Sequence, residues 1–430
     1  MTAQSRPRGA HEPSRTRPLR SRRTVVAVFL ALAGLAVPLA PPGAAAEAPA
    51  AAANTGLRQL ARDLVAAGAP GVIVRVDDGT GPPVEITEQA PWAAKEYRLR
   101  ADDEFRMGSN TKTMIATLVL QLVAEGRLDL ADPVEKWLPG RVPDGRAITL
   151  RMLLNHTSGL FDYTEDTAVL PSLLGKDRRR WTPTRLLALG VRHDPLFAPG
   201  TKWSYSNTNY AAIGAVLEKA TGEGLAELVR DRIARPLGLR HTYYATDGAW
   251  RGPHARGHEP DAAHMPPGVP AAFREYAGTP REGHVDVSDN SPSWGGPAGA
   301  VVSTARDWAR FHTALMSGGL LPAAQLAQLR TTVPMSPDEP DGPGYGLGIM
   351  TLKTPCGTVW AHDGGIPGYL STTLTDATGS RTAAVLVATE AFAEHPDAFP
   401  EITRAARTLQ SATLCAMLGE PAPAPSAGTG

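Results

Sequence analysis

Three short motifs in a fixed order constrain this chain more than any other feature of its sequence. They are Ser109-Asn110-Thr111-Lys112, Tyr205-Ser206-Asn207 and His362-Asp363-Gly364. Because an α-helix has 3.6 residues per turn, Ser-x-x-Lys places a hydroxyl and an amine on the same helix face. The other two motifs offer a second proton carrier, a hydrogen-bonding group for a substrate and a strand edge. Together the motifs predict a hydrolase in which a serine forms an acyl-enzyme.

The residues after Ser109 have the pattern of an amphipathic helix that ends near Gly126. Its predicted apolar face comprises Met114, Ile115, Leu118, Leu122 and Val123. Ser109 would thus lie at the helix N-terminus, where free N–H groups and the helix dipole favour negative charge. The chain has only seven lysines beside 36 arginines, and Lys, unlike Arg, can lose its proton. Lys112 is therefore a candidate general base.

The N-terminal segment has the features of a secretory signal peptide. Residues 1–23 contain seven arginines and a single acid, and an apolar run follows from Thr24 to Ala40. Ala44-Ala45-Ala46 then provides a small-residue cleavage site. This pattern predicts a signal peptide over residues 1–46 and a protein secreted to the cell-wall space. The apolar run is short and interrupted by a proline, so no membrane span is expected after processing. Arg22-Arg23 leaves both the Sec and the twin-arginine export routes open.

Composition favours a globular enzyme over a nucleic-acid-binding protein. The 430 residues are 42% hydrophobic and 20% charged, which is enough for a large core. Without the predicted signal peptide the chain has 36 basic and 42 acidic side chains, so no basic surface for nucleic acid is expected. Cys356 and Cys415 are the only cysteines, and an even count in an exported chain predicts one disulfide. His254 and His258 stand among Pro and Gly and do not predict a metal site.

Periodicity along the chain predicts elements that form two lobes. Helices are predicted over residues 55–67 and 398–418, and strands over 72–76, 358–361, 370–375 and 383–388. Residues 47–110 and 296–418 are predicted to form a sheet lobe. Residues 111–295 are predicted to form a helical lobe, with a long polar surface loop over 249–293. The Pro/Ala/Ser/Gly-rich tail over 419–430 predicts disorder.

The three motifs, with the residues around them and four other stretches, resemble serine D-alanyl-D-alanine carboxypeptidases of the low-molecular-weight penicillin-binding protein and class C β-lactamase family. The matching stretches are Phe105–Lys112, Leu153–Leu160, Pro199–Tyr210, Pro236–Leu239, Pro297–Gly299, Tyr345–Gly348 and His362–Gly364. The likeness covers roughly residues 55–418. His156, within the second stretch, is interpreted as a structural residue of a turn. The carboxypeptidases that the chain resembles also have a cysteine a few residues before the His-x-Gly motif and one in the last helix, as Cys356 and Cys415 are placed here.

The resemblance implies an α/β (α+β) fold of the β-lactamase/DD-peptidase type. This fold has an antiparallel sheet flanked by helices, an inserted all-helical lobe, and a cleft between the two. In it Ser109 is the nucleophile, and either Lys112 or Tyr205 takes its proton. Asn207 is expected to hydrogen bond the acyl side of the substrate. His362 is expected to help hold the two candidate bases in their working protonation states.

A second group of residues is expected to surround the substrate. By resemblance, the backbone N–H groups of Ser109 and Gly365 would form the oxyanion hole. Asp363, Gly364 and Gly365 are expected to contact the substrate along one strand. Trp294 resembles the aromatic wall of the acyl pocket, although a core position is an alternative.

The chain departs from the carboxypeptidase pattern where a C-terminal carboxylate of the substrate would bind. In the enzymes that it resembles, an arginine and two threonines hold this carboxylate. The corresponding places here, counted from Gly348 and around His362, hold Met350, Asp363 and Gly365. Because an aspartate repels a carboxylate, weak carboxypeptidase activity and a neutral or cationic leaving group are predicted.

Another cation could compensate for the missing arginine. Lys353 is a candidate, but on a strand it points to the opposite face from Met350. Arg274 or Arg281, from the 249–293 segment, would preserve carboxypeptidase activity if either reached the site.

Several activities stay open because a fold does not fix a reaction. The main prediction is an exported, D-alanyl-D-alanine carboxypeptidase-like hydrolase of peptides that contain D-amino acids. The alternatives are a D-amino-acid amidase or aminopeptidase, an esterase, a β-lactamase, or a binding protein that β-lactams acylate with little turnover. The expected partners are small peptide, amide or ester substrates, with β-lactams as covalent inhibitors. No cofactor, metal or nucleic acid is expected, and the chain is predicted to be a monomer.

Overall fold

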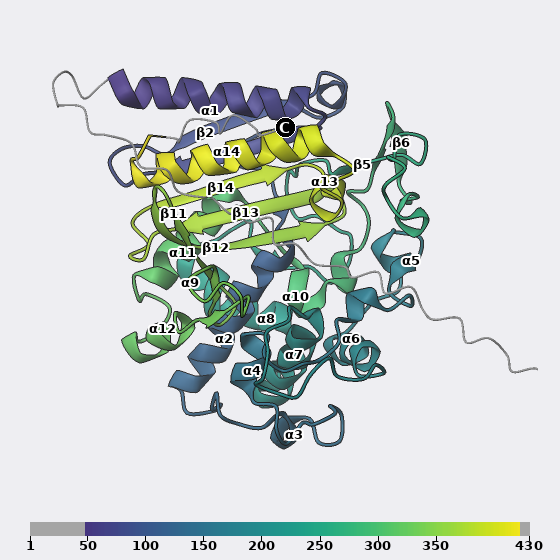
Figure 1. Cartoon of the computed structure of the whole chain (residues 1–430), viewed down its shortest axis with the longest axis vertical. Helices are drawn as coiled ribbons and strands as arrows, with labels where there is room; N and C mark the ends of the chain where they lie inside the picture. Colours follow the sequence, from purple (N-terminus) through teal and green to yellow (C-terminus); the bar gives the residue numbers. More distant parts are fainter. Residues whose placement is uncertain (1–47, 422–430) are drawn as a thin grey trace, which may run out of the picture.

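The computed structural model of the chain describes residues 48–421 (Figure 1). The predicted signal peptide and most of the predicted tail lie outside the described residues. An eight-stranded antiparallel sheet has the order β2-β1-β14-β13-β12-β11-β10-β9, and helices from the middle of the chain lie below it in Figure 1. The pairing of β1 with β14 brings the two ends of the chain into one sheet. The predicted fold class is therefore confirmed.

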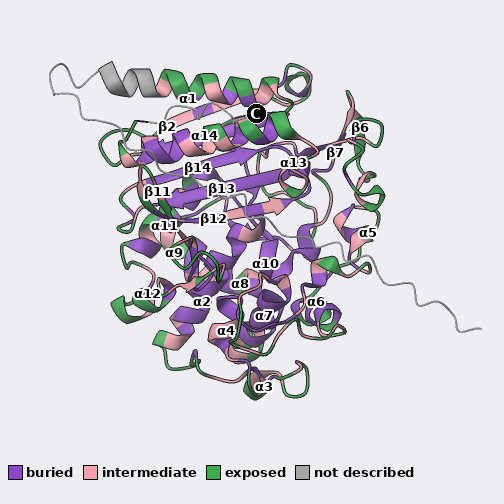
Figure 2. Ribbon diagram, in the orientation of Figure 1, coloured by how far each residue is buried: buried purple, intermediate pink, exposed green. Residues whose placement is uncertain are grey.

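The long strands of the sheet are buried runs. The strand bounds are β1 (Gly71–Asp77), β2 (Val84–Gln89), β9 (Val333–Pro334), β10 (Gly344–Tyr345), β11 (Met350–Thr354), β12 (Gly357–Ile366), β13 (Tyr369–Thr375) and β14 (Thr382–Val387). Every residue of β13 and β14 is buried, as their purple colour in Figure 2 shows. Such strands lose the alternation of polar and apolar residues because other elements cover both faces of the sheet.

Three long helices cover the two faces of the sheet. They are α1 (Ala48–Ala66), α11 (Ala305–Met316) and α14 (Pro400–Leu418). Leu64 of α1 and Leu409 of α14 share one apolar cluster with Val74 of β1. Phe311 of α11 belongs to a second cluster, with Ile73 of β1. Because successive strand residues point to opposite faces, α1 and α14 cover one face and α11 covers the other.

The helical lobe consists of short helices around α2. Its elements are α2 (Thr111–Ala124), α3 (Val134–Trp137), α4 (Leu150–Leu154), η3 (Tyr163–Glu165), α5 (Leu170–Leu173), α6 (Pro183–Gly190), α7 (Asn207–Thr221), α8 (Leu225–Val229), η4 (Arg230–Ala234), α9 (Arg235–Leu237), η6 (Pro292–Trp294) and α10 (Gly296–Gly299). The amphipathic pattern predicted for α2 is wrong in one respect, since every residue from Thr111 to Leu120 is buried. The reason is that α7, α8, α10 and the outlying α12 (Ala323–Leu329) surround this helix.

The polar composition of residues 249–293 predicted a long surface loop. This prediction is wrong in part, because the segment contains three short strands. The remaining elements of the structure are η1 (Ala93–Lys95), β3 (Phe105–Arg106), η2 (Gly108–Asn110), β4 (Tyr243–Tyr244), β5 (His258–Pro260), η5 (Ala271–Phe273), β6 (Thr279–Arg281), β7 (His284–Asp286), β8 (Val301–Ser303) and α13 (Ala391–Glu394). Within the segment, β5, β7 and β6 form a small antiparallel sheet.

A buried carboxylate explains why this segment is ordered against the main sheet. Glu259 of β5 is fully buried. Its carboxylate accepts hydrogen bonds from the backbone N–H groups of Gly368, Glu390 and Ala391. The hydroxyl of Thr389 donates a fourth hydrogen bond to it. One side chain thus ties the segment to the β12–β13 turn and to the residues before α13.

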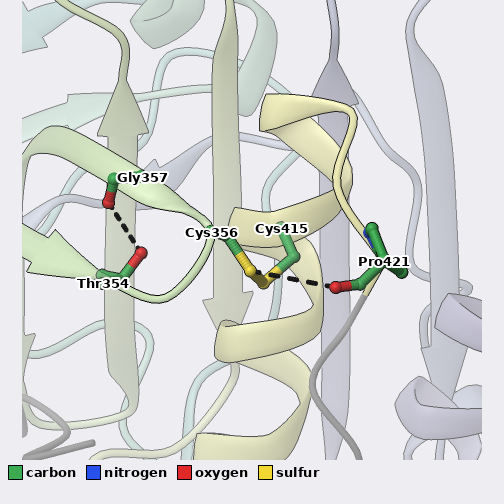
Figure 3. The surroundings of a disulfide bond; sticks show 5 residues. All are labelled: Thr354, Cys356, Gly357, Cys415 and Pro421. Atoms are coloured by element: carbon green, nitrogen blue, oxygen red, sulfur yellow. Dashed lines mark hydrogen bonds between the residues drawn. A yellow bond between two sulfur atoms is a disulfide. The ribbon is translucent and has the colours of Figure 1, made fainter. Parts of the chain in front are cut away.

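The predicted disulfide is confirmed between Cys356 and Cys415 (Figure 3). Cys356 lies in the turn between β11 and β12, and Cys415 lies in the last helix, α14. The two Cα atoms are 5.3 Å apart. The bond therefore anchors the start of the strand that carries His362. None of the described helices combines the length and the apolar composition that crossing a membrane would need.

Candidate active site

Ser109 lies in the short turn η2, immediately before α2 and against β12. Two glycines permit this close approach of the turn and the strand. Gly108 has a φ of +48°, and a Cβ on it would lie 2.7 Å from the carbonyl carbon of Gly364. A Cβ on Gly364 would lie 1.9 Å from the carbonyl oxygen of Met107, which no side chain could accommodate. Gly364 is not among the described residues that line the cavity, and its evident role is to admit this backbone packing.

Lys112 is fully buried one turn after Ser109, and its amine contacts three oxygen atoms. Its Nζ lies 3.0 Å from Oγ of Ser109, 2.8 Å from Oδ1 of Asn207 and 2.9 Å from the carbonyl oxygen of Ala298. Burial lowers the pKa of Lys112 to about 7, and the charge of Asp162 opposes this effect. A neutral amine has two hydrogens and one lone pair. Since the two carbonyl oxygens can only accept hydrogen bonds, the lone pair is left for the Ser109 hydroxyl.

Asn207 connects Lys112 to a buried carboxylate that the sequence patterns did not indicate. Its Oδ1 accepts a hydrogen bond from Lys112, and its Nδ2 donates one to Oδ2 of Asp162 at 2.9 Å. Both ends of the amide are thus engaged within the protein. Asn207 also lines the cavity, so its contact with the acyl side of a substrate stays a prediction. Asp162 lies just after the Leu153–Leu160 stretch, but no local pattern distinguishes a buried Asp from a turn residue.

Tyr205 adjoins the same two groups from the residues before α7. The Nζ of Lys112 lies 4.7 Å from the centre of the Tyr205 ring, and Tyr205 and Ser109 line the same cavity. Burial raises the pKa of Tyr205 well above its ordinary value, and a hydrogen bond with Ser109 lowers it in part. A phenol that holds its proton so firmly suits the donation of a proton to a leaving group. The contact of Lys112 with Oγ of Ser109 and the firmly held proton of Tyr205 are both consistent with Lys112 as the base, which stays a prediction.

His156 was interpreted as a structural turn residue, but its ring also packs against the ring of Tyr205 in the site. Its Nδ1 accepts hydrogen bonds from the backbone N–H of Ser206 and from Nδ2 of Asn209, both at 3.1 Å. These two donors assign the proton to Nε2, which donates to Oη of Tyr345 at 3.2 Å. The imidazole ring centre lies 4.3 Å from that of Tyr205. His156 thus braces the phenol ring from behind.

The hydrogen-bond chain continues from Tyr345 to the third motif. Oη of Tyr345 donates to Nε2 of His362 at 3.0 Å, and Nδ1 of His362 donates to the carbonyl oxygen of Asp363. Burial lowers the pKa of His362 to about 3, and the charge of Lys112 lowers it further. Burial lowers the pKa of His156 as well, so both imidazoles are neutral near pH 7. The predicted influence of His362 is consistent with this position, although its described hydrogen bonds go to Tyr345 and the backbone.

A cavity of about 160 Å³ opens beside Ser109. Much of its wall is apolar and is formed by Tyr163, Leu173, Phe273, Tyr276, Trp294, Met335, Met350, Ile366 and Leu370. Trp294 is 8% exposed, so the wall and core alternatives for this residue both hold. Four carboxylate side chains also line the cavity: Glu165, Asp363, Glu390 and Glu394. None of the described lining residues is Lys or Arg.

The places that hold a carboxylate in carboxypeptidases lie in this cavity. Met350 and Asp363 line it. Burial raises the pKa of Asp363 to about 7, and its Oδ1 is buried without a hydrogen-bond partner among the described residues. A Cβ on Gly365 would lie 2.3 Å from Oε1 of Glu390. The second threonine place is therefore occupied by a carboxylate from the residue before α13.

The candidate replacement cations lie elsewhere. Lys353 is largely exposed and pairs with Asp341 at 3.8 Å. Arg274 donates to the backbone oxygens of Val269 and Pro267. Arg281 pairs with Glu96 at 2.7 Å. None of these three cations is among the described residues that line the cavity.

The edge of β12 beside Ser109 is open to a substrate. The last pair between β11 and β12 joins Met350 to Ala361, so within the described part of the chain residues 362–366 have no partner strand on that side. Gly365 lines the cavity, and its backbone nitrogen lies 2.8 Å from the place of a Cβ on Gly108. This proximity supports the predicted pairing of its N–H with that of Ser109. Within residues 48–421, no group of three or more His, Cys, Asp or Glu is placed to hold a metal ion.

Comparison with known proteins agrees with this geometry. The chain matches the protein family described as Beta-lactamase over residues 57–407. It is 33% identical over 267 residues to the esterase EstB of Burkholderia gladioli. The aligned region covers 59% of this chain and 67% of EstB. It is 32% identical over 286 residues to penicillin-binding protein 4 of Amycolatopsis lactamdurans, which covers 62% of this chain and 65% of that protein. The matches therefore span about two thirds of these curated relatives.

A solved structure matches over a larger share of the chain. The crystal structure of a D-stereospecific amidohydrolase from Streptomyces sp. has 38% sequence identity and a TM-score of 0.69. The match covers 80% of this chain and 98% of that one. With the Ser-x-x-Lys pair, the Tyr-x-Asn motif and the His-x-Gly strand assembled around one cavity, the chain belongs to the β-lactamase family of serine hydrolases.

Proposed function

We propose that this chain is an exported serine hydrolase that forms an acyl-enzyme on Ser109 with amides or peptides of D-amino acids. In this proposal the leaving group carries no free carboxylate. The observation that carries the proposal is the cavity wall formed by Met350, Asp363 and Glu390, where a carboxypeptidase needs a cation and hydroxyl donors. Export is supported by the signal-peptide features of residues 1–46 and by the disulfide.

The acylation step follows from the contacts of Lys112. The neutral amine takes the proton of the Ser109 hydroxyl as Oγ bonds to the substrate carbonyl carbon. The carbonyl oxygen becomes an oxyanion, which the N–H groups of Ser109 and Gly365 stabilise. The proton then passes from Lys112, through Tyr205, to the leaving nitrogen as the C–N bond breaks. A water molecule releases the acyl group by the same steps, and Ser109 regains its proton.

Charge decides which leaving group this cavity favours. Above about pH 7, where Asp363 is mostly ionised, a substrate carboxylate about 4 Å from it would be opposed by roughly 4 kcal/mol at an effective dielectric constant of 20. The side chain of Glu390 lies beside Gly365 in the same wall, where a carboxypeptidase needs a hydroxyl donor. An amide, an amine or ammonia avoids the repulsion. A preference for D-amino acids is supported by the likeness to the D-stereospecific amidohydrolase.

The test compares two substrates that differ only at the leaving end. We expect kcat/KM for a D-alanyl-D-alanine peptide amide to exceed that for the free acid by at least tenfold, consistent with a like-charge penalty. Asp363→Thr should shift this preference toward the acid. Asp341→Thr, which changes an exposed aspartate outside the cavity, is the matched control and should leave the ratio unchanged.

A clear preference of the unmodified enzyme for the free acid would contradict the proposal. Adding a small ester and a cephalosporin to the same substrate panel separates the remaining activities of this scaffold. Turnover of the ester alone would favour an esterase. Turnover of the cephalosporin alone would favour a β-lactamase.

A further inference from the structure

The neighbourhood of Lys112 contains a charged group beyond the three motifs. Oδ1 of Asn207 accepts from Lys112 at 2.8 Å, and Nδ2 of the same amide donates to Asp162 at 2.9 Å. One neutral amide therefore separates the amine from the carboxylate. We propose that Asp162 is a positioning residue that sets the proton affinity of Lys112 through Asn207. This inference rests on the proposed function, because it takes Lys112 as the base of the reaction.

The hydrogen bonds of Asp162 keep it in the carboxylate form. The side chain is buried, with an exposed fraction of 4%. Oδ1 accepts from the backbone N–H of Thr164 at 3.0 Å and from the hydroxyl of Thr164 at 2.9 Å, and Oδ2 accepts from Asn207. Burial raises the pKa of Asp162, and these three donors lower it. Burial outweighs the donors in the pKa itself, which is raised overall, but all three described hydrogen bonds are donated to Asp162, and such bonds stabilise the carboxylate form.

The aromatic and imidazole groups around Lys112 are neutral, and Asp363, which lines the same cavity and has a pKa raised to about 7, is not among the charges that shift the pKa of Lys112. The ring of Tyr205, just before α7, and that of Tyr210, within α7, lie 4.7 and 5.4 Å from its Nζ. Burial raises the pKa of both phenols. His156, from the residues after α4, and His362, from β12, are held neutral by burial. Among the described groups, Asp162 is thus the charge that favours a proton on Lys112.

The spacing of the charges gives the amine an intermediate proton affinity. A buried amine without a counter-charge binds its proton too weakly to be an effective base. A directly paired amine would keep its proton and have no lone pair for Ser109. With one amide between the charges, Lys112 is balanced near neutrality, where it can both take and return a proton. Asn207 thereby acts as a spacer as well as a cavity residue.

The first test removes the charge and keeps the shape of the side chain. In Asp162→Asn, the acid limb of the pH profile should move to lower pH by about one unit, because a proton on Lys112 loses its counter-charge. The rate at the high-pH plateau should fall, because the amine becomes a weaker base. The measurement is the second-order rate of Ser109 modification by a fluorophosphonate that does not titrate between pH 5 and 10. Asp166→Asn, on the same segment but outside this chain of contacts, is the control and should keep the wild-type limb.

The second test exchanges the two groups and keeps the net charge. In Asp162→Asn combined with Asn207→Asp, the carboxylate contacts Lys112 directly, so the acid limb should move to higher pH than in the wild type. The two variants therefore shift the limb in opposite directions, which a merely structural role would not produce. An acid limb that stays in place in the folded variants overturns the inference. If Asp162→Asn does not fold, the charge-swapped variant decides alone.

The same experiment distinguishes a failure of the proposed function from a failure of the role of Asp162. If the fluorophosphonate does not modify Ser109 in the wild type at any pH, the acyl-enzyme itself is wrong. If Ser109 is modified but neither variant moves the limb, only the role of Asp162 is wrong.

Discussion

At Gly364 the backbone of β12 lies so close to Met107 that only a hydrogen fits in place of a side chain. The His-x-Gly motif therefore contains its glycine for a steric reason. Neighbouring Gly365 is different, since a Cβ there meets only the end of the Glu390 side chain. A flexible side chain can rotate away, but a backbone carbonyl cannot. The two glycines thus offer a matched pair of substitutions.

We expect Gly364→Ala to abolish Ser109 acylation, because the added methyl forces the Ser109 turn away from β12. Gly365→Ala should retain more of the acylation rate than Gly364→Ala, because its added methyl meets the end of a side chain and not a backbone carbonyl. Acylation by the fluorophosphonate and thermal unfolding of both variants provide the measurement. Gly364→Ala with wild-type acylation would show that this close packing does not position the nucleophile.

The residues of the site differ in how far the sequence alone predicted them. Ser109 and Lys112 were predicted because their chemistry depends on a fixed spacing within one helix. The contacts of Asp162 and Tyr345 could not be predicted, because they depend on elements far apart in the chain. Asp162 meets Asn207 across 45 residues, and Tyr345 lies between two histidines from different lobes. Such relations become visible only when the fold is known.

At the scale of elements, burial changed two predictions. The apolar spacing predicted α2 correctly as a helix, but not that other helices enclose it on all sides. The segment over 249–293 looked like a surface loop because its residues are polar. Its fully buried Glu259 instead accepts four hydrogen bonds from the main body of the structure. Composition cannot distinguish a polar residue in solvent from one that is satisfied by hydrogen bonds inside the protein.

The contacts of Glu259 lead to a prediction for stability. Glu259→Gln keeps the size of the side chain but turns an NH2 group toward backbone N–H donors. We expect the free energy of unfolding to fall by about 1–3 kcal/mol, the usual effect of leaving buried hydrogen-bonding groups unpaired. Urea unfolding measures this change. Glu275→Gln, at an exposed ion pair with Lys176, should change stability far less, and equal effects of the two substitutions would contradict this role of Glu259.

At the scale of the whole molecule, the two ends of the chain form one sheet and the middle forms the helical lobe. The active site lies where these parts meet, with Ser109 at the sheet and Tyr205 and Asn207 from the helical side. The elements predicted along the chain and the family resemblance had led us to expect this arrangement. The charge of the cavity was predicted only in part. Asp363 was recognised in the sequence, whereas the carboxylate of Glu390 reaches the cavity from a different segment.

Mapping the covalent adduct tests the central claim most directly. The wild-type protein is incubated with a fluorophosphonate or with benzylpenicillin, digested and examined by peptide mass spectrometry. We expect a single adduct on Ser109 and none in Ser109→Ala, whose turnover should also be lost. An adduct on another serine, or no adduct with either reagent in correctly folded protein, would contradict the assignment of Ser109 as the nucleophile.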